Sequence, residues 1–183
     1  MKIGVLSDTH DHLEVFDAMA AAFKKAGVTA LIHCGDWVAP FAMRELVKVL
    51  RDALPDIPIK GVLGNNEGER FRLPALAKSL GVGLEEDILE TVIDGRKIAI
   101  YHGTAEPLVE ALVVSQKYDL VCRGHTHTAN QNQVSKTLEL NPGTPAAVVN
   151  FDTPPRGTVA VYDTKTGQAE IVKLNLSPIP PCH

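Results

Sequence analysis

The chain has 183 residues, of which 45% are hydrophobic and 22% are charged, enough apolar material for the core of one compact domain. Its formal net charge of -4 and its sequence pI near 6.0 argue against the basic patch that stable binding of nucleic acid requires. We expect a single domain over residues 1–183, with an extended tail at residues 176–183.

Cysteine usage indicates a reducing compartment. The three cysteines, Cys34, Cys122 and Cys182, form no C-x-x-C pair, so neither a disulfide framework nor a zinc knuckle is predicted. The opening residues lack the basic and long apolar regions of a signal peptide, and no segment reaches the roughly 18 apolar residues of a membrane span. We therefore expect a cytoplasmic protein with no membrane association.

Short apolar runs alternate with segments of helical spacing over the first two-thirds of the chain, which is the order of a β-α-β-α fold. The runs that predict strands are residues 3–6, 30–32, 59–63 and 120–122. Proline at the start and glycine at the end mark the expected helices, which are residues 13–26, 40–54, 74–80 and 107–117.

Two β-hairpins are predicted after residue 88. One turns at Asp94-Gly95, a type I′ signal, and the other has residues 165–167 at its tip, after an extended stretch at residues 137–140. A parallel βα half followed by hairpins predicts two packed sheets, each covered by helices on its outer face.

Asp, Asn or His side chains follow the four apolar runs and the second strand of the first hairpin, at the rim where open α/β sheets bind ligands. In D-T-H we expect Asp8 and His10 to point to one side, because side chains alternate along an extended segment. The same holds for His125 and His127 in G-H-T-H. The residues at this rim are Asp8, His10, Asp36, Asn65, Asn66, Glu67, His102, His125 and His127.

Taken singly, each of these residues has an ordinary alternative. Asp8 could be a helix N-cap, Asp36 or Asn65 a turn residue, and His102 a satisfied histidine at a strand end. Random loop composition would scatter such residues, whereas here they follow the apolar runs. By contrast, His33 lies inside an apolar run and is expected to be buried and structural, and His12, at a helix start, is given no metal role.

Imidazole, carboxylate and amide groups without thiolate suit divalent Mn, Fe, Co, Ni or Zn. Seven such groups exceed the about four ligands of a tetrahedral zinc site. Two ions ~3.5–4 Å apart that share a bridging carboxylate could use all seven. The pattern therefore favours a two-metal centre.

The series D-x-H, G-D, G-N-x-[DE], H-G and G-H-x-H, met in this order, resembles the calcineurin-like metallophosphoesterase superfamily. It looks closest to the small phosphodiesterases of the YfcE type, and the N-P-G-T stretch at residues 141–144 is similar to that family's N-P-G-S turn. The resemblance runs from residue 1 to about residue 172. It implies a four-layer α/β/β/α sandwich of two mixed sheets, with metals at the carboxyl ends of the strands.

The resemblance also implies a dinuclear centre of two divalent ions, with Mn or Ni expected first and Fe, Co or Zn as alternatives. Its metal-bridging hydroxide would hydrolyse phosphate diesters. No Ser or Cys lies in a suitable nucleophile motif, so no covalent intermediate is expected. Carried over by position, the metal ligands are Asp8, His10 and His127 for one ion, Asn65, His102 and His125 for the other, and Asp36 for both.

The residues assigned to catalysis are Asp36, Asn66 and His125, and those assigned to substrate contact are Asn65, Asn66, Thr104 and Arg123. Asn66 stands where many phosphatases of the superfamily have His and the YfcE type usually has Cys. A carboxamide is not a useful general acid, so we predict weak activity on alkyl monoesters and a preference for aryl diesters. Thr104 replaces the second His of the relatives' H-G-H and brings no positive charge to the phosphate.

Two other readings stay open. The retromer-type trafficking subunit shares this fold and binds partner proteins, but its site is altered, whereas this chain keeps D-T-H. A purely structural metal site is the third reading, although such sites are closed by protein ligands. Relatives are often dimers or tetramers, so a homodimer or homotetramer is expected, and Glu67 is expected to orient a neighbouring group through hydrogen bonds.

Overall fold

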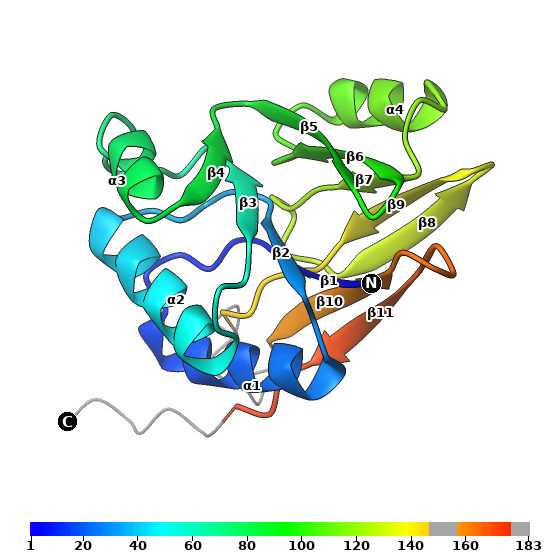
Figure 1. Cartoon of the computed structure of the whole chain (residues 1–183). Helices are drawn as coiled ribbons and strands as arrows, with labels where there is room; N and C mark the ends of the chain where they lie inside the picture. Colours follow the sequence, from blue (N-terminus) through cyan, green and yellow to red (C-terminus); the bar gives the residue numbers. More distant parts are fainter. Residues whose placement is uncertain (147–156, 177–183) are drawn as a thin grey trace, which may run out of the picture.

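Two mixed β-sheets pack face to face in the computed structural model, which describes residues 1–146 and 157–176 (Figure 1). One sheet has six strands in the order β11-β10-β1-β2-β3-β4, and the other has five in the order β5-β6-β7-β9-β8. The six-stranded sheet consists of β1 (Lys2–Leu6), β2 (Ala30–His33), β3 (Ile59–Val62), β4 (Val82–Glu85), β10 (Thr158–Asp163) and β11 (Gln168–Lys173). The five-stranded sheet consists of β5 (Ile88–Ile93), β6 (Arg96–Tyr101), β7 (Leu120–Cys122), β8 (Asn130–Val134) and β9 (Thr137–Asn141).

Helices cover the outer face of each sheet, so the predicted four-layer α/β/β/α sandwich is confirmed (Figure 1). One side carries the 3-10 turn η1 (Leu13–Val15) with α1 (Phe16–Ala26), α2 (Pro40–Ala53) and α3 (Leu73–Ser79), and the opposite side carries α4 (Glu106–Val114). Three apolar clusters hold the layers together. The first cluster packs α1 and α2 on their sheet and includes Phe23 and Leu46. The second lies between the two sheets and includes Val5 and Ile100, and the third packs α4 on its sheet and includes Val113.

The residues that predicted helix ends and a hairpin turn have the expected backbone positions in the structure. Gly27 ends α1 in the left-handed conformation with φ 71°, and Pro40 is the first residue of α2. Asp94 and Gly95 both have positive φ, as a type I′ hairpin requires. Helix α4 ends three residues before the predicted Lys117, because Ser115 Oγ bonds back to the Leu112 carbonyl and Gln116 takes φ 53°.

Two edge strands were not predicted. Strand β8 reads N-Q-N-Q-V and is mostly exposed, and its position is fixed by backbone pairing with β9. Strand β4, at the edge of the other sheet, pairs in parallel with β3. Neither has the apolar run by which strands are found in a sequence.

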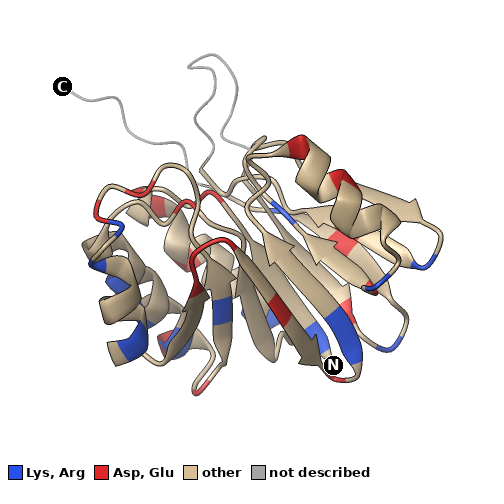
Figure 2. Cartoon of the chain, turned by 90° about the horizontal axis from the view of Figure 1, so that it is seen from above, with Lys and Arg blue, Asp and Glu red and all other residues tan. Residues whose placement is uncertain are grey.

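Acidic and basic residues are interspersed over the outer helices and strands (Figure 2). Over the part of the chain that the structure describes, the helices lack the combined length and apolarity needed to span a bilayer. Of the predicted tail, residues 177–183 lie outside the described residues.

Candidate metal centre

The loops after β1 and β2 form one side of the site. The Cys34 N–H donates to the Leu6 carbonyl at 2.8 Å, the Asp8 N–H to the Gly35 carbonyl at 2.9 Å, and the His10 N–H to the Asp36 carbonyl at 3.1 Å. The pairing of β1 with β2 thus continues past both strands and carries Asp8, His10 and Asp36 to the same rim.

Five of the seven predicted ligands have a left-handed backbone, which non-glycine residues rarely adopt. The prediction that D-T-H and G-H-T-H are extended segments is therefore wrong. Their side chains still converge, but they do so because tight left-handed turns aim them and not because of strand alternation. The five φ values are 53° at Asp8, 47° at His10, 60° at Asp36, 70° at His125 and 57° at His127.

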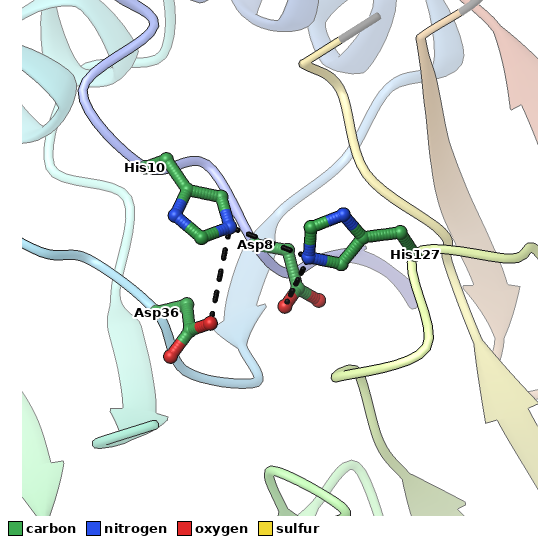
Figure 3. A group of neighbouring side chains, drawn as sticks. All are labelled: Asp8, His10, Asp36 and His127. Atoms are coloured by element: carbon green, nitrogen blue, oxygen red, sulfur yellow. Dashed lines mark hydrogen bonds and ion pairs between the residues drawn. The ribbon is translucent and has the colours of Figure 1, made fainter. Parts of the chain in front are cut away.

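One group of side chains comprises Asp8, His10, Asp36 and His127, whose ligand atoms all lie within 4.8 Å of one another and point toward a common centre (Figure 3). His127 Nε2 is 3.3 Å from Asp8 Oδ1 and 3.3 Å from His10 Nε2. Asp8 is fully buried, and no described residue donates a hydrogen bond to its Oδ1. A buried carboxylate oxygen without a donor is costly, and a bound cation would remove that cost.

A second group comprises Asn65, His102 and His125. Asn65 Oδ1 lies 2.9 Å from both His102 Nε2 and His125 Nδ1. His102 Nδ1 donates its hydrogen to the Cys34 carbonyl at 2.8 Å, so a neutral His102 turns the lone pair of Nε2 toward Asn65. Acceptor atoms that face one another in this way fit a metal ion between them.

Asp36, a member of the first group, also faces the second group. Its Oδ1 is 3.4 Å from His102 Nε2, and its Oδ2 is 3.8 Å from His10 Nε2. The Asn66 backbone N–H donates to Oδ1 at 2.8 Å and helps to fix the carboxylate. All seven predicted ligands therefore meet at one site. Asp8 caps neither η1 nor α1, since neither helix start has a side-chain cap.

The pKa shifts of Asp8 and His10 favour the forms that bind a cation, whereas that of His127 opposes it. Burial would raise the pKa of Asp8, but the neighbouring side chains of His127, Ser7 and His102 outweigh it and lower that pKa. Burial lowers the pKa of His10, which keeps this imidazole neutral. The contact with Asp8 raises the pKa of His127. A metal at this position would therefore displace a proton from His127 at mildly acidic pH.

Glu67 orients the Asp36 loop, as predicted. Its Oε1 accepts the backbone N–H groups of Asp36 at 3.0 Å, Trp37 at 3.2 Å and Gly64 at 2.8 Å, and its Oε2 accepts that of Val38 at 2.6 Å. At Gly64 a Cβ atom would lie 2.0 Å from Asp36 Oδ1, so only glycine fits this close approach.

The N-P-G-T stretch supports both the G-H-T-H loop and the D-T-H loop, a role that sequence reasoning missed although the motif itself was the signal. Asn141 Nδ2 donates to the Gly124 carbonyl at 2.9 Å, and Thr144 Oγ1 donates to the Asp8 carbonyl at 2.7 Å. Gly124 is required here because a Cβ would lie 1.8 Å from Ser7 Oγ.

Arg123 does not reach the metal ligands. Its guanidinium bonds both carboxylate oxygens of Glu106 at 2.7 Å and contacts Glu139 at 3.3 Å, and only 6% of its side chain is exposed. This arrangement argues against the predicted contact with substrate. Thr104 is exposed, and its Oγ1 is 2.9 Å from the Tyr101 hydroxyl.

A cavity of about 380 Å³ lies beside the first group of ligands. His10, His12, Asn66 and His127 line it, and the Asn66 amide is 3.4 Å from His10 Nδ1. Of the residues assigned to substrate contact, Asn66 therefore faces open space next to the ligand cluster.

A four-layer sandwich with Asp, His and Asn side chains gathered at its strand ends defines a metal-dependent phosphoesterase. The chain belongs to the calcineurin-like phosphoesterase superfamily, whose domain model matches residues 1–167. It is 35% identical over 144 residues to phosphodiesterase MJ0936 of Methanocaldococcus jannaschii, covering 78% of this chain and 83% of that protein. It is 30% identical over 152 residues to the probable metallophosphoesterase MJ0623 of the same organism, covering 79% and 68%.

Solved structures share this fold. An archaeal phosphodiesterase superposes with a TM-score of 0.83 at 32% identity, over 95% of this chain and 100% of that one. Vps29 of Entamoeba histolytica in complex with zinc superposes with a TM-score of 0.63 at 17% identity, over 96% and 100%. At that identity the likeness to Vps29 shows the fold alone.

Proposed function

We propose that this protein is a phosphodiesterase that binds two divalent ions at this cluster. Asp8, His10 and His127 would hold one ion, Asn65, His102 and His125 the other, and Asp36 both. The observation that carries the proposal is the position of the Asp36 carboxylate, whose two oxygens face the two groups at 3.4 and 3.8 Å. The ligand set suits Mn or Ni first, with Fe, Co or Zn as alternatives.

Two such ions would supply activated water and neutralise the charge of the phosphate. The protein's own part is to hold the ligands and to receive the ester. Asn66 lines the cavity, where its carboxamide can donate a hydrogen bond to an ester but has no proton to give to a leaving group. The leaving group must therefore depart as a stable anion, which favours aryl diesters over alkyl monoesters.

The name of the relative MJ0936 also supports a diester substrate. Arg123 is held by Glu106 and Glu139, so we assign it a structural role. The cytoplasmic location, the single domain over residues 1–183 and the homodimer or homotetramer stay predictions.

Metal-stripped protein, given Mn, Ni, Co, Zn or Mg one at a time, tests the proposal with bis(p-nitrophenyl) phosphate and p-nitrophenyl phosphate as substrates. We expect a transition metal to restore turnover of the diester above that of the monoester, and His125→Ala to abolish it. His12→Ala is the matched control for metal content, because His12 lines the cavity but is not a proposed ligand. Failure of every ion to restore turnover, despite bound metal, would contradict the proposal.

That last outcome would favour a protein-binding scaffold, a reading that the fold shared with Vps29 keeps open. The two readings differ in what a ligand substitution does. Loss of His125 should abolish turnover in an enzyme, whereas a scaffold would lose only its metal.

A further inference from the structure

His33 is a buried histidine outside the proposed ligand set. It ends β2, has none of its surface exposed, and stacks on the Trp37 ring with centroids 3.6 Å apart and planes 16° apart. The Trp37 indole N–H donates to the Val62 carbonyl at 2.9 Å, so the stack is anchored to β3. The imidazole therefore has one fixed orientation.

Both ring nitrogens of His33 are hydrogen-bonded, and the partners set their roles. The Gly35 backbone N–H can only donate, so His33 Nδ1 accepts it at 3.1 Å. Nε2 then carries the hydrogen and donates to Thr9 Oγ1 at 3.0 Å. Burial lowers the pKa of His33 to about 3, so this neutral form persists over the physiological range.

The two partners of His33 lie on the two ligand loops. Thr9 is the middle residue of D-T-H, between Asp8 and His10, and Gly35 directly precedes Asp36. These three ligands have left-handed backbones with φ between 47° and 60°. Such conformations cost about 1–3 kcal/mol each and persist only where surrounding contacts hold them.

We propose that His33 is a positioning residue that joins the Asp8–His10 loop to the Asp36 loop and thereby sets the affinity for the ion between them. The metal role rests on the proposed function, whereas the hydrogen bonds belong to the protein alone. Loss of hydrogen bonds behind metal ligands commonly weakens metal affinity by about 10- to 100-fold.

A residue that only fills the core would behave differently, and substitutions separate the two roles. His33→Leu removes both hydrogen bonds at similar volume. His33→Asn keeps an acceptor near the position of Nδ1, and Thr9→Val removes only the hydroxyl that receives Nε2–H. Leu46→Ala is the control for a loss of stability alone, because Leu46 is a buried residue of α2 and takes part in neither hydrogen bond of His33.

The test is a cobalt titration of each full-length variant followed by visible absorption, with urea unfolding of the metal-free protein in parallel. We expect His33→Leu and Thr9→Val to weaken the binding of one cobalt equivalent by about 10-fold or more and to change its spectrum. His33→Asn should recover part of the affinity. Leu46→Ala should lower stability but leave the titration unchanged.

Wild-type affinity and spectrum in both Thr9→Val and His33→Leu would overturn the inference, as would an equal loss in Leu46→Ala. If His33→Leu fails to fold, Thr9→Val decides alone. Normal cobalt binding without diester turnover would contradict the proposed function and leave this inference standing. A wild-type chain that binds no cobalt would overturn both.

Discussion

Asp36 is the residue on which the two ligand groups depend. Its side chain is only 4% exposed, and its neighbours within 4 Å include imidazoles from both groups. The Asn66 N–H and the Glu67 carboxylate fix its position from the protein side. A carboxylate held so firmly between two sets of acceptors fits a bridging ligand better than a surface turn.

We predict that Asp36→Asn lowers the turnover of a phosphodiester by roughly two orders of magnitude or more, because the amide removes the negative charge that two ions would share. The amide oxygen can still accept the Asn66 N–H, so the free energy of unfolding of the metal-free protein should change by less than about 1 kcal/mol. Steady-state kinetics and urea unfolding check both parts. Unfolding of the domain would instead favour a structural metal site.

We predict that Asn66→His increases the hydrolysis of an alkyl phosphate, because an imidazole can protonate a poor leaving group. General acid catalysis contributes about 100-fold or more in enzymes, and about 10-fold is expected from a group that was not selected for the task. Rates on alkyl and aryl phosphates should be compared, with Asn66→Ala as control. An unchanged rate on the alkyl ester would refute this account of the substrate preference.

At the scale of elements, an ion pair joins helix α4 to the end of strand β7. The hydrogen bonds from Arg123 lower the pKa of Glu106 at the start of α4. The folded chain therefore favours the ionised Glu106, and the stability that this provides is present above the ordinary pKa of 4.5 and is lost as the pH falls through the lower, folded value.

We therefore predict that Glu106→Gln reduces the stability of the metal-free protein at pH 7 by less than about 1 kcal/mol, since the Glu106 side chain is 58% exposed. As the pH falls below 4.5 and through the lower, folded pKa of Glu106, the difference from the unsubstituted chain should shrink toward zero. Urea midpoints measured from pH 7 to pH 3 check this. A difference that grows as the pH falls would show that the ion pair is not its cause.

Local signals predicted most elements of the fold. Gly27, Pro40 and Asp94-Gly95 act through their own backbone preferences, so their effect can be read without the rest of the chain. Strand β8 was missed because its polar residues gain their place only from pairing with β9. The same holds for β4, which follows β3 at the sheet edge.

Residue types and their order identified the seven proposed ligands, but the reason that their side chains converge was not predictable. The left-handed turns at Asp8 and His125 depend on contacts between distant segments, such as the bond from Thr144 Oγ1 to the Asp8 carbonyl, 136 residues away. The ion pairs of Arg123 were missed for the same reason, since Glu106 and Glu139 come from α4 and β9. A sequence motif shows which side chains are present, but it does not show the long-range contacts that fix their positions.

At the scale of the molecule, the proposed ligands come from the ends of strands in both sheets. Asp8, Asp36 and Asn65 follow strands of the six-stranded sheet, whereas His102 and His125 follow strands of the five-stranded sheet. Bound cations would therefore tie the two sheets together at the rim.

We predict that saturating Mn raises the thermal midpoint of unfolding, because ligands that bind only the folded state stabilise it. At a free concentration 100 times the dissociation constant the gain is about 2.7 kcal/mol per site. His125→Ala should lose part of this gain, whereas His12→Ala should keep it. Equal midpoints with and without metal would contradict the prediction.

The central claim is that one cluster holds two ions on either side of Asp36. Anomalous diffraction from a crystal grown with Mn tests it most directly. We predict two peaks ~3.5–4 Å apart. One should lie among Asp8, His10 and His127 and the other among Asn65, His102 and His125. A single peak at full occupancy, or none at saturating Mn, would contradict the claim.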